Sequence, residues 1–497
     1  MTLPTDGADA ASIAAALQAY REDDAPTTGG RVLAYVYDSG IADLEAVGNA
    51  ALTAFSGVNA LDPTVFPSVA RIENDLVGWG LDLLAGGPAA VGVVTSGGTE
   101  SCMLAVKAAR EQWRADHPDS PRRPTVIMPI TAHSAFVKAT ELLDVDRVML
   151  PVDPTTFQVR TSDVAAALDE AGSDAALVVL SAPSYAHGVI DPIEDIAPIA
   201  AERGVPVHVD ACIGGWILPF LSQLGYQVPP FDFRVPGVRS MSVDLHKYAY
   251  APKGTSLLLF SDPEYRLNSY FAYSDWPGYP VVNTTLQSTK SAGPMAAAWA
   301  VCRRIGLDGY RELVLATRRA TDAIIAAVDE IDGLRVLGQP ASTLIALAAD
   351  GPDGVDPFLL ADAMSARGWF IQAQPGVAGL PRTAHLTVQA TTLGGIDEFC
   401  EALRSAAAEA AQQPWAAADP QLEAAAMALD PSTLDLATVD ALLKFAGLDA
   451  GESPGLPAEA AGIQALLEAL PTQLRDTLLA GYFSAIFQPS REPAGDS

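Results

Sequence analysis

Short apolar runs alternate with longer amphipathic stretches in the middle of the chain, from about residue 91 to residue 260. The runs have the length and composition of buried strands. They lie at 91–94, 125–129, 147–150, 176–180, 205–209, 240–243 and 256–260. This alternation predicts an α/β fold with a mostly parallel sheet, in which ligands bind at the carboxyl ends of the strands.

The flanking segments follow other patterns. Residues 1–30 are polar and end in glycine, which predicts an arm. Apolar residues at helical spacing predict helices at 39–55, 68–85 and 295–305. Further strands are expected at 334–337, 342–347 and 385–388, an alanine-rich helix at 405–428, and two or three helices within 432–487. A Pro- and Tyr-rich stretch, 275–294, predicts a functional loop.

These patterns divide the chain into four parts. We expect an N-terminal arm and helix (1–75), a large ligand-binding domain (76–305), a small C-terminal α/β domain (306–415) and a helical extension (416–497).

Charge and composition narrow the possible partners. The 497 residues include 30 basic and 60 acidic side chains, a formal net charge of −30, which would repel nucleic acid and anionic membranes. No apolar run reaches the roughly 20 residues of a membrane span, and the acidic N-terminus lacks a signal-peptide core. The four cysteines form no CxxC pair, which argues against a zinc site and disulfides and indicates a cytoplasmic protein.

Lys247 and Asp210 are the strongest candidates for chemistry. Each follows a predicted strand, in His208-Val-Asp210 and Asp244-Leu-His-Lys247. A buried lysine can bond covalently to the aldehyde of pyridoxal 5′-phosphate (PLP), and an aspartate keeps the cofactor's ring nitrogen protonated. Either dipeptide alone is ordinary structure, so the prediction rests on their joint occurrence.

A glycine pair follows the first predicted strand, in Thr95-Ser-Gly97-Gly98-Thr99. Backbone N–H groups at the start of the next helix can hold a phosphate there, although a Gly-Gly turn is also an ordinary helix start. His133 follows the second strand and could stack on an aromatic ring. His187 lies in a loop suited to pass beneath that ring, and Lys253 could bring a cation to an anionic substrate; a plain turn explains either equally well.

Taken together, these motifs resemble the sphingosine-1-phosphate lyases of the group II PLP-dependent decarboxylase family, which have fold type I. The resemblance rests on the segments Thr95–Ser101, His133–Phe136, His187–Pro192, His208–Cys212, Phe231–Val238 and Asp244–Gly254, and extends from about Val36 into the C-terminal helices.

The resemblance implies a homodimer with shared active sites and PLP on Lys247. It places Asp210 at the ring nitrogen, His133 on the ring, and Gly97, Gly98 and Thr99 at the cofactor phosphate. His246, Ser291 and Gly293 would add phosphate contacts, the last two from the partner subunit. Tyr37 and Lys253 match positions near the polar end of the substrate. Asn59 is the first residue of another family motif, residues 59–63, that would contact the substrate.

One departure from the family pattern leaves the substrate open. Asp62 stands where the family has histidine, in Asn59-Ala-Leu-Asp62-Pro, which should disfavour a phosphate by a few kcal/mol if the site is desolvated. Lys290 and Leu245 replace the usual arginine and threonine. We therefore expect retro-aldol cleavage of a phosphorylated or unphosphorylated β-hydroxy amine, with L-amino-acid decarboxylation as the alternative. A chain that kept the fold but lost catalysis would show damaged cofactor residues, and none is visible.

Overall fold

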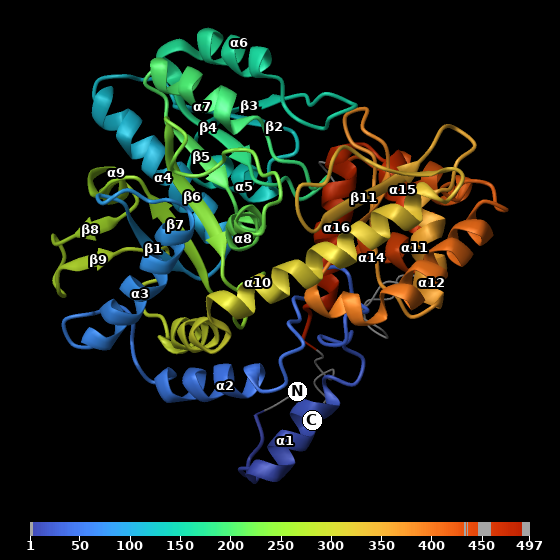
Figure 1. Ribbon diagram of the computed structural model, residues 1–497, viewed down its shortest axis with the longest axis horizontal. Helices are drawn as coiled ribbons and strands as arrows, with labels where there is room; N and C mark the ends of the chain where they lie inside the picture. Colours follow the sequence, from blue (N-terminus) through green and yellow to red (C-terminus); the bar gives the residue numbers. More distant parts are fainter. Residues whose placement is uncertain (1–2, 432–433, 435, 446–458, 490–497) are drawn as a thin grey trace, which may run out of the picture.

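The computed structural model describes residues 3–431, 434, 436–445 and 459–489. A seven-stranded sheet forms the centre of the large lobe, on the left in Figure 1. Its strands are β1 (Val91–Thr95), β2 (Thr125–Pro129), β3 (Asp146–Leu150), β4 (Ala175–Ser181), β5 (Val207–Asp210), β6 (Val238–Asp244) and β7 (Ser256–Phe260), in the order β1-β7-β6-β5-β4-β2-β3. Only β7 runs antiparallel to both of its neighbours. The predicted α/β fold with a mostly parallel sheet is confirmed.

Helices follow most strands of this sheet and cover it. They are α2 (Leu44–Phe55), α3 (Pro67–Leu83), α4 (Gly98–Asp116), α5 (Ser134–Leu142), α6 (Thr161–Ala171), α7 (Ile193–Glu202), α8 (Leu218–Gln223) and α9 (Pro263–Leu267). The central strands are buried along their whole length, as the continuous apolar runs require. Because β1, β2, β4, β5 and β6 all point the same way, the loops that follow them meet at one edge of the sheet.

A second, four-stranded antiparallel sheet forms the centre of the smaller lobe. Its strands are β10 (Leu334–Val336), β11 (Leu344–Ala349), β12 (Gln372–Gln374) and β13 (Thr383–Thr387), covered by α11 (Pro357–Ala366) and α12 (Ile396–Ala410). The long helix α10 (Gly293–Asp329) connects the two lobes (Figure 1). Gly306 kinks it with φ 66°, at the residue where we expected the small domain to begin.

Four helices lie in the described part of the C-terminal segment. They are α13 (Pro420–Met427), α14 (Leu436–Phe445), α15 (Ala461–Ala469) and α16 (Thr472–Ile486). The single helix expected at 405–428 is wrong, because the chain leaves the helix after α12 and passes through Pro414 before α13 begins. Part of the expected helix at 39–55 is also irregular, since α2 starts only at Leu44.

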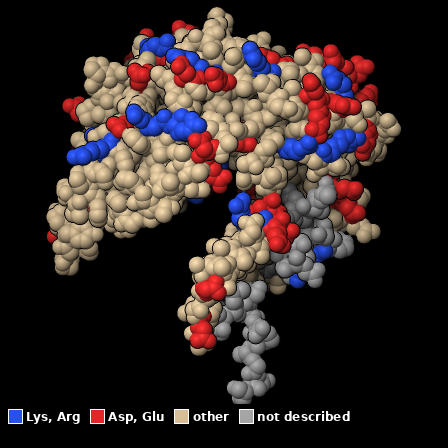
Figure 2. All heavy atoms as spheres, turned by 60° about the horizontal axis from the view of Figure 1, so that its bottom comes forward, with Lys and Arg blue, Asp and Glu red and all other residues tan. Residues whose placement is uncertain are grey.

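Four short elements were not expected. The arm contains α1 (Ala10–Ala19), which has no buried residue and projects from the molecule (Figures 1 and 2). The hairpin of β8 (Phe271–Tyr273) and β9 (Val281–Asn283) surrounds the start of the loop 275–294, and β12 lies at the edge of the small sheet. All four are too short or too exposed to leave a clear periodic pattern.

Candidate active site

A cavity of about 400 Å³ opens at the sheet edge where the loops after the strands converge. Its walls come from the loops after β1, β2, β4, β5 and β6. The lining residues are Ser96, Gly97, Gly98, Thr99, Glu100, Cys102, His133, Ser181, Pro183, Tyr185, Asp210, Cys212, Ile213, Asp244, His246 and Lys247. Residues more than 140 positions apart in sequence thus share one small space.

Lys247 is paired with a buried carboxylate in this cavity. Its Nζ lies 2.8 Å from Oδ2 of Asp244, whose Oδ1 accepts a very short hydrogen bond from Ser256. Burial disfavours the charge of Lys247, but the attraction of Asp244 outweighs it, so the pKa of Lys247 lies well above its usual value. Burial likewise opposes the charge of Asp244, yet Lys247 and His246 hold the pKa of that carboxyl below its usual value.

Asp210 is oriented by two hydrogen bonds at the end of β5. Its Oδ1 accepts from the backbone N–H of Cys212 at 3.1 Å and from the hydroxyl of Ser242 at 3.2 Å. Behind it, His208 contacts Ser242 at 3.2 Å, and burial lowers the pKa of His208 to about 4. The imidazole is therefore neutral at pH 7, and within the described residues Oδ2 of Asp210 is left for a group in the cavity.

The glycine loop lies against the carboxylate of Asp244. A methyl group at Gly98 would lie 2.8 Å and 2.9 Å from the two oxygens of Asp244, so only glycine fits there. Gly98 begins the 19-residue helix α4, whose first N–H groups have no partner within the helix. Glu100 fixes the loop, because its Oε2 accepts from the backbone N–H of Ser96 at 2.6 Å and its Oε1 from Leu286 N–H at 2.7 Å.

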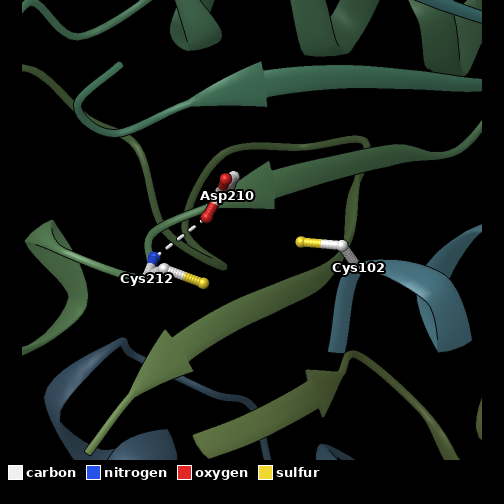
Figure 3. Close-up of side chains that lie close together, drawn as sticks. All are labelled: Cys102, Asp210 and Cys212. Carbon is white, nitrogen blue, oxygen red and sulfur yellow. Dashed lines mark hydrogen bonds between the residues drawn. The ribbon is translucent and has the colours of Figure 1, made fainter. Parts of the chain in front are cut away.

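Two thiols lie beside Asp210. The sulfur atoms of Cys102 and Cys212 point toward each other, and the three possible ligand atoms lie within 4.8 Å of one another (Figure 3). Burial raises the pKa of the Cys102 thiol, and a hydrogen bond with Cys102 together with burial raises that of Cys212. Since both thiols stay protonated and Oδ1 of Asp210 already accepts two hydrogen bonds, we interpret this cluster as a wall of the cavity.

Aromatic residues and a lysine lie close to the cavity, and one of them, Tyr185, is part of its wall. The Nζ of Lys253 lies 4.8 Å from the ring centre of Tyr37 and donates to the backbone oxygen of Tyr35 at 3.0 Å. Burial raises the pKa of Tyr37 to about 12. Tyr185, which lines the cavity, donates to Gln372 in β12 at 2.6 Å and packs on His385 with ring centres 4.2 Å apart. The small lobe therefore contacts the wall of the cavity through Tyr185.

Similarity to known proteins agrees with this geometry. Residues 35–346 match the model of the pyridoxal-dependent decarboxylase conserved domain. The chain belongs to the pyridoxal-dependent decarboxylase family. Within it, the chain is homologous to sphingosine-1-phosphate lyases, being 39% identical to that of Dictyostelium discoideum over 72% of this chain and 64% of the relative. The chain thus spans slightly less than two thirds of that relative's length.

Solved structures agree in fold. The sphingosine-1-phosphate lyase of Burkholderia pseudomallei is 36% identical, with a TM-score of 0.77 over 83% of this chain and 93% of that one. Glutamate decarboxylase of Lactobacillus brevis superposes with a TM-score of 0.72 at 20% identity, which shows the fold alone. The predicted fold type I architecture is confirmed.

Residues 420–485 match a C-terminal helix-turn-helix type domain of pyridoxal-dependent enzymes, which we did not predict. This segment holds nine acidic and two basic residues, a charge that disfavours contact with nucleic acid. None of the described helices is long and apolar enough to cross a membrane.

The cavity suits the family's cofactor. Lys247 and Asp210 both line it, as do the predicted phosphate residues Gly97, Gly98 and Thr99. His133 and His246 line it too; His133 caps α5 by accepting from Ala135 N–H, and Nδ1 of His246 lies 2.9 Å from the Thr255 carbonyl. An amine, a carboxylate and a helix start with free N–H groups match an aldehyde, a ring nitrogen and a phosphate, respectively.

Other predicted site residues lie outside the cavity. His187 stacks on Phe157 with ring centres 4.4 Å apart, and burial lowers its pKa to about 4. Asn59 and Ser291 form a backbone bridge elsewhere, and Gly293 begins α10 beside them. Asp62 is exposed and accepts from the backbone and hydroxyl of Thr64, at 2.9 Å and 2.6 Å, so its carboxylate is turned into its own loop.

Sequence reasoning gave no role to several residues in and beside the cavity, among them Asp244, Tyr35 and Gln372. Asp244 stood in a quoted motif without a role, although its position three residues before Lys247 could have indicated an ion pair. Tyr35 and Gln372 left no signal, because the contact between them joins positions 337 residues apart.

Proposed function

We propose that this protein is a PLP-dependent carbon–carbon lyase that cleaves a β-hydroxy amine, phosphorylated at its head, into an aldehyde and an amine in retro-aldol fashion. The observation that carries the proposal is that Lys247 and Asp210 line one cavity in a chain homologous to sphingosine-1-phosphate lyases.

Bound PLP supplies an electron sink for the bond that breaks at the substrate's Cα. In our proposal Asp210 keeps the ring nitrogen protonated, and its orientation by Ser242 and Cys212 holds that proton in place. The free N–H groups at Gly98 and Thr99 bind the cofactor phosphate, with Gly97 in the same loop, and His133 stacks on the ring. Lys247 holds the cofactor and carries a proton at Nζ, where Asp244 stabilises it.

We further propose a homodimer whose subunits complete each other's sites. Asn59, Asp62, Ser291 and Gly293 do not line the cavity of their own chain. The β8–β9 hairpin exposes large apolar side chains that a partner could cover; they include Phe271, Tyr273, Trp276, Tyr279 and Val282. Two largely uncharged projections extend from the face seen in Figure 2, as a subunit interface would require.

Location and domain division remain proposals as well. Four free buried cysteines support a cytoplasmic location. The two separate sheets and the kink at Gly306 support a boundary near residues 305 and 306.

Amino-acid decarboxylation is the second candidate. Asp62 would favour it if this residue faces the substrate of the partner subunit, because an acid near the substrate head disfavours a phosphate. Product analysis separates the two. The purified holoenzyme would be given sphingosine 1-phosphate and, in parallel, a panel of L-amino acids. We expect a long-chain aldehyde from the lipid phosphate; carbon dioxide from an amino acid without any aldehyde would overturn the lyase proposal. Lys247→Ala, which lacks the cofactor amine, is the control.

A further inference from the structure

A chain of hydrogen bonds runs from the wall of the cavity to the small lobe and to the N-terminal segment. The hydroxyl of Tyr185 donates to Oε1 of Gln372 at 2.6 Å, and Nε2 of Gln372 donates to the hydroxyl of Tyr35 at 2.5 Å. Tyr185 lies in the cavity wall, Gln372 in β12 of the small lobe, and Tyr35 in the N-terminal segment. Three segments far apart in the sequence therefore meet at one carboxamide.

The direction of these bonds decides what Tyr35 can do. Gln372 uses its oxygen for Tyr185 and an N–H for Tyr35, so the Tyr35 oxygen acts as an acceptor. The proton of the Tyr35 hydroxyl is then free to be donated elsewhere. Tyr35 is 61% exposed, so this donor is open to solvent and to a ligand.

The backbone of Tyr35 holds this geometry at a cost. Its φ is 62°, in the left-handed region that a tyrosine rarely adopts. The residues around it in the sequence are less exposed: Leu33 and Ala34 are fully buried and Tyr37 is half-buried. In this conformation the Tyr35 hydroxyl accepts a hydrogen bond from Gln372 while the Tyr35 carbonyl oxygen accepts one from Lys253. Strain of this kind is concentrated at functional positions.

Lys253 supplies a positive charge beside this hydroxyl. It is held by the carbonyl of Tyr35 and the ring of Tyr37, and it forms no ion pair with any carboxylate in the described part of the chain. Two of its three N–H donors remain after the bond to Tyr35. In a protein of net charge −30, an exposed lysine without a carboxylate partner is suited to an anionic ligand.

We propose that Tyr35 is a specificity-determining residue that donates a hydrogen bond to the anionic head of the substrate beside Lys253, and that Gln372 is the residue that positions it. The inference rests on the proposed function for the identity of the substrate, an amine with a phosphorylated head. What is new is that Tyr35 contacts the anionic head and that Gln372 positions Tyr35.

The test compares two small amines on the PLP-loaded enzyme, phosphoethanolamine and ethanolamine, which differ only in the phosphate. Their binding is followed by the change in the cofactor's visible absorption. We expect Tyr35→Phe and Gln372→Leu each to weaken phosphoethanolamine about tenfold and ethanolamine less than about twofold, since only the former loses a hydrogen bond to a charged group. Tyr226→Phe, a ring-preserving change outside the cavity, is the matched control.

A double variant tests the positioning role. If Gln372 acts through Tyr35, the pair of changes should weaken phosphoethanolamine no more than the stronger single change. Gln372→Glu keeps the size of the side chain, but its carboxylate would accept the Tyr35 proton and repel the phosphate. It should therefore weaken phosphoethanolamine more than Gln372→Leu does, and the difference should shrink at high salt.

Equal weakening of both amines, additive effects in the double variant, or a wild type that binds both amines alike would overturn the inference. A separate result would refute the proposed function. Aldehyde release is assayed separately, and a wild type that releases no aldehyde while the variants still lose phosphoethanolamine selectively would refute the lyase activity but keep the assignment of Tyr35.

Discussion

Nζ of Lys247 donates to Oδ2 of Asp244 across 2.8 Å, and this contact keeps the lysine charged in a buried cavity. Asp244→Asn removes the opposing charge, so burial should lower the pKa of Lys247. Because only the neutral amine reacts with an aldehyde, the rate at which apoenzyme takes up PLP should reach its half-maximum at a pH lower by about one unit or more.

The measurement is the growth of the cofactor's visible absorption at a series of pH values. Ser256→Ala is the matched control, because it removes a hydrogen bond to Asp244 but leaves the charge in place. An unchanged pH profile in Asp244→Asn would show that Asp244 does not control the protonation of Lys247.

The two loop glycines should respond differently to alanine. At Gly98 a methyl group would lie 2.9 Å from Sγ of Cys212 and as close to Asp244, whereas at Gly97 the nearest atom is Cε1 of His246 at 3.8 Å. Gly98→Ala should therefore lower the free energy of unfolding of the apoenzyme by about 1–3 kcal/mol. Gly97→Ala should change it by less than about 0.5 kcal/mol.

Urea unfolding of both apoenzymes, monitored by fluorescence, distinguishes these outcomes. Equal stability of the two variants would mean that the wall formed by Asp244 and Cys212 moves freely away from the loop.

The parts of the site that follow strands could be predicted from the sequence, because a strand end fixes where the next side chain lies. Asp210 and Lys247 are examples, and both line the cavity. His187 also follows a strand, yet its ring turns away to stack on Phe157. A motif fixes the path of the loop, but tertiary packing decides where each side chain points.

Contacts between distant segments could not be predicted. The bond between Tyr35 and Gln372 depends on how the small sheet lies against the N-terminal segment, which no local pattern records. In α10 the predicted helix end at residue 305 coincides with the kink at Gly306, but the second helical stretch, which packs on the small lobe and ends at Asp329, was not predicted.

Asp62 offers a test of the substrate head. Its carboxylate is held within its own turn by Thr64. If Asp62 faces the partner's substrate, as we propose, Asp62→His should raise kcat/KM for a phosphorylated substrate about tenfold relative to its unphosphorylated form, because a repelling charge becomes a donor. Steady-state kinetics on the two substrates measure the ratio.

Thr64→Val is the control for that change, since it loosens the same turn without altering the charge of Asp62. If Thr64→Val reproduced the effect of Asp62→His, the turn and not the charge would set the preference.

Arg382 links the C-terminal helices to the small lobe. Its guanidinium contacts the fully buried Asp356 at 3.3 Å, forms a very short ion pair with Glu468 of α15, and lies 4.3 Å from the ring centre of Phe358. Arg382→Ala would leave the buried carboxylate of Asp356 without its counter-ion, and should lower the free energy of unfolding by about 3–5 kcal/mol.

Arg31→Ala, which breaks the more exposed pair with Glu398, should cost at most about 1 kcal/mol. Thermal unfolding of both variants gives the comparison. A small effect of Arg382→Ala would mean that Asp356 is satisfied by its backbone donors at Phe358 and Ala416 alone.

Asp191 should make the protein less stable as the pH rises toward neutrality. Its Oδ2 accepts from the backbone N–H of Ser181 at 2.8 Å, while its buried Oδ1 has no partner among the described residues. Burial raises the pKa of Asp191 to about 7 from an ordinary value of 3.8. Below pH 4 the folded and unfolded chains both hold the proton, and the stabilising contribution is complete.

Between pH 4 and 7 the unfolded chain releases that proton while the folded chain keeps it, so the free energy of unfolding falls, by at most about 4 kcal/mol in this interval. Asp191→Asn cannot ionise and should remove this slope from urea unfolding measured across the interval. Asp169→Asn is a control of opposite sign, because Arg203 holds the pKa of the exposed Asp169 below its usual value and its contribution is lost on acidification. Parallel stability curves for wild type and Asp191→Asn would mean that Asp191 is charged in the folded protein.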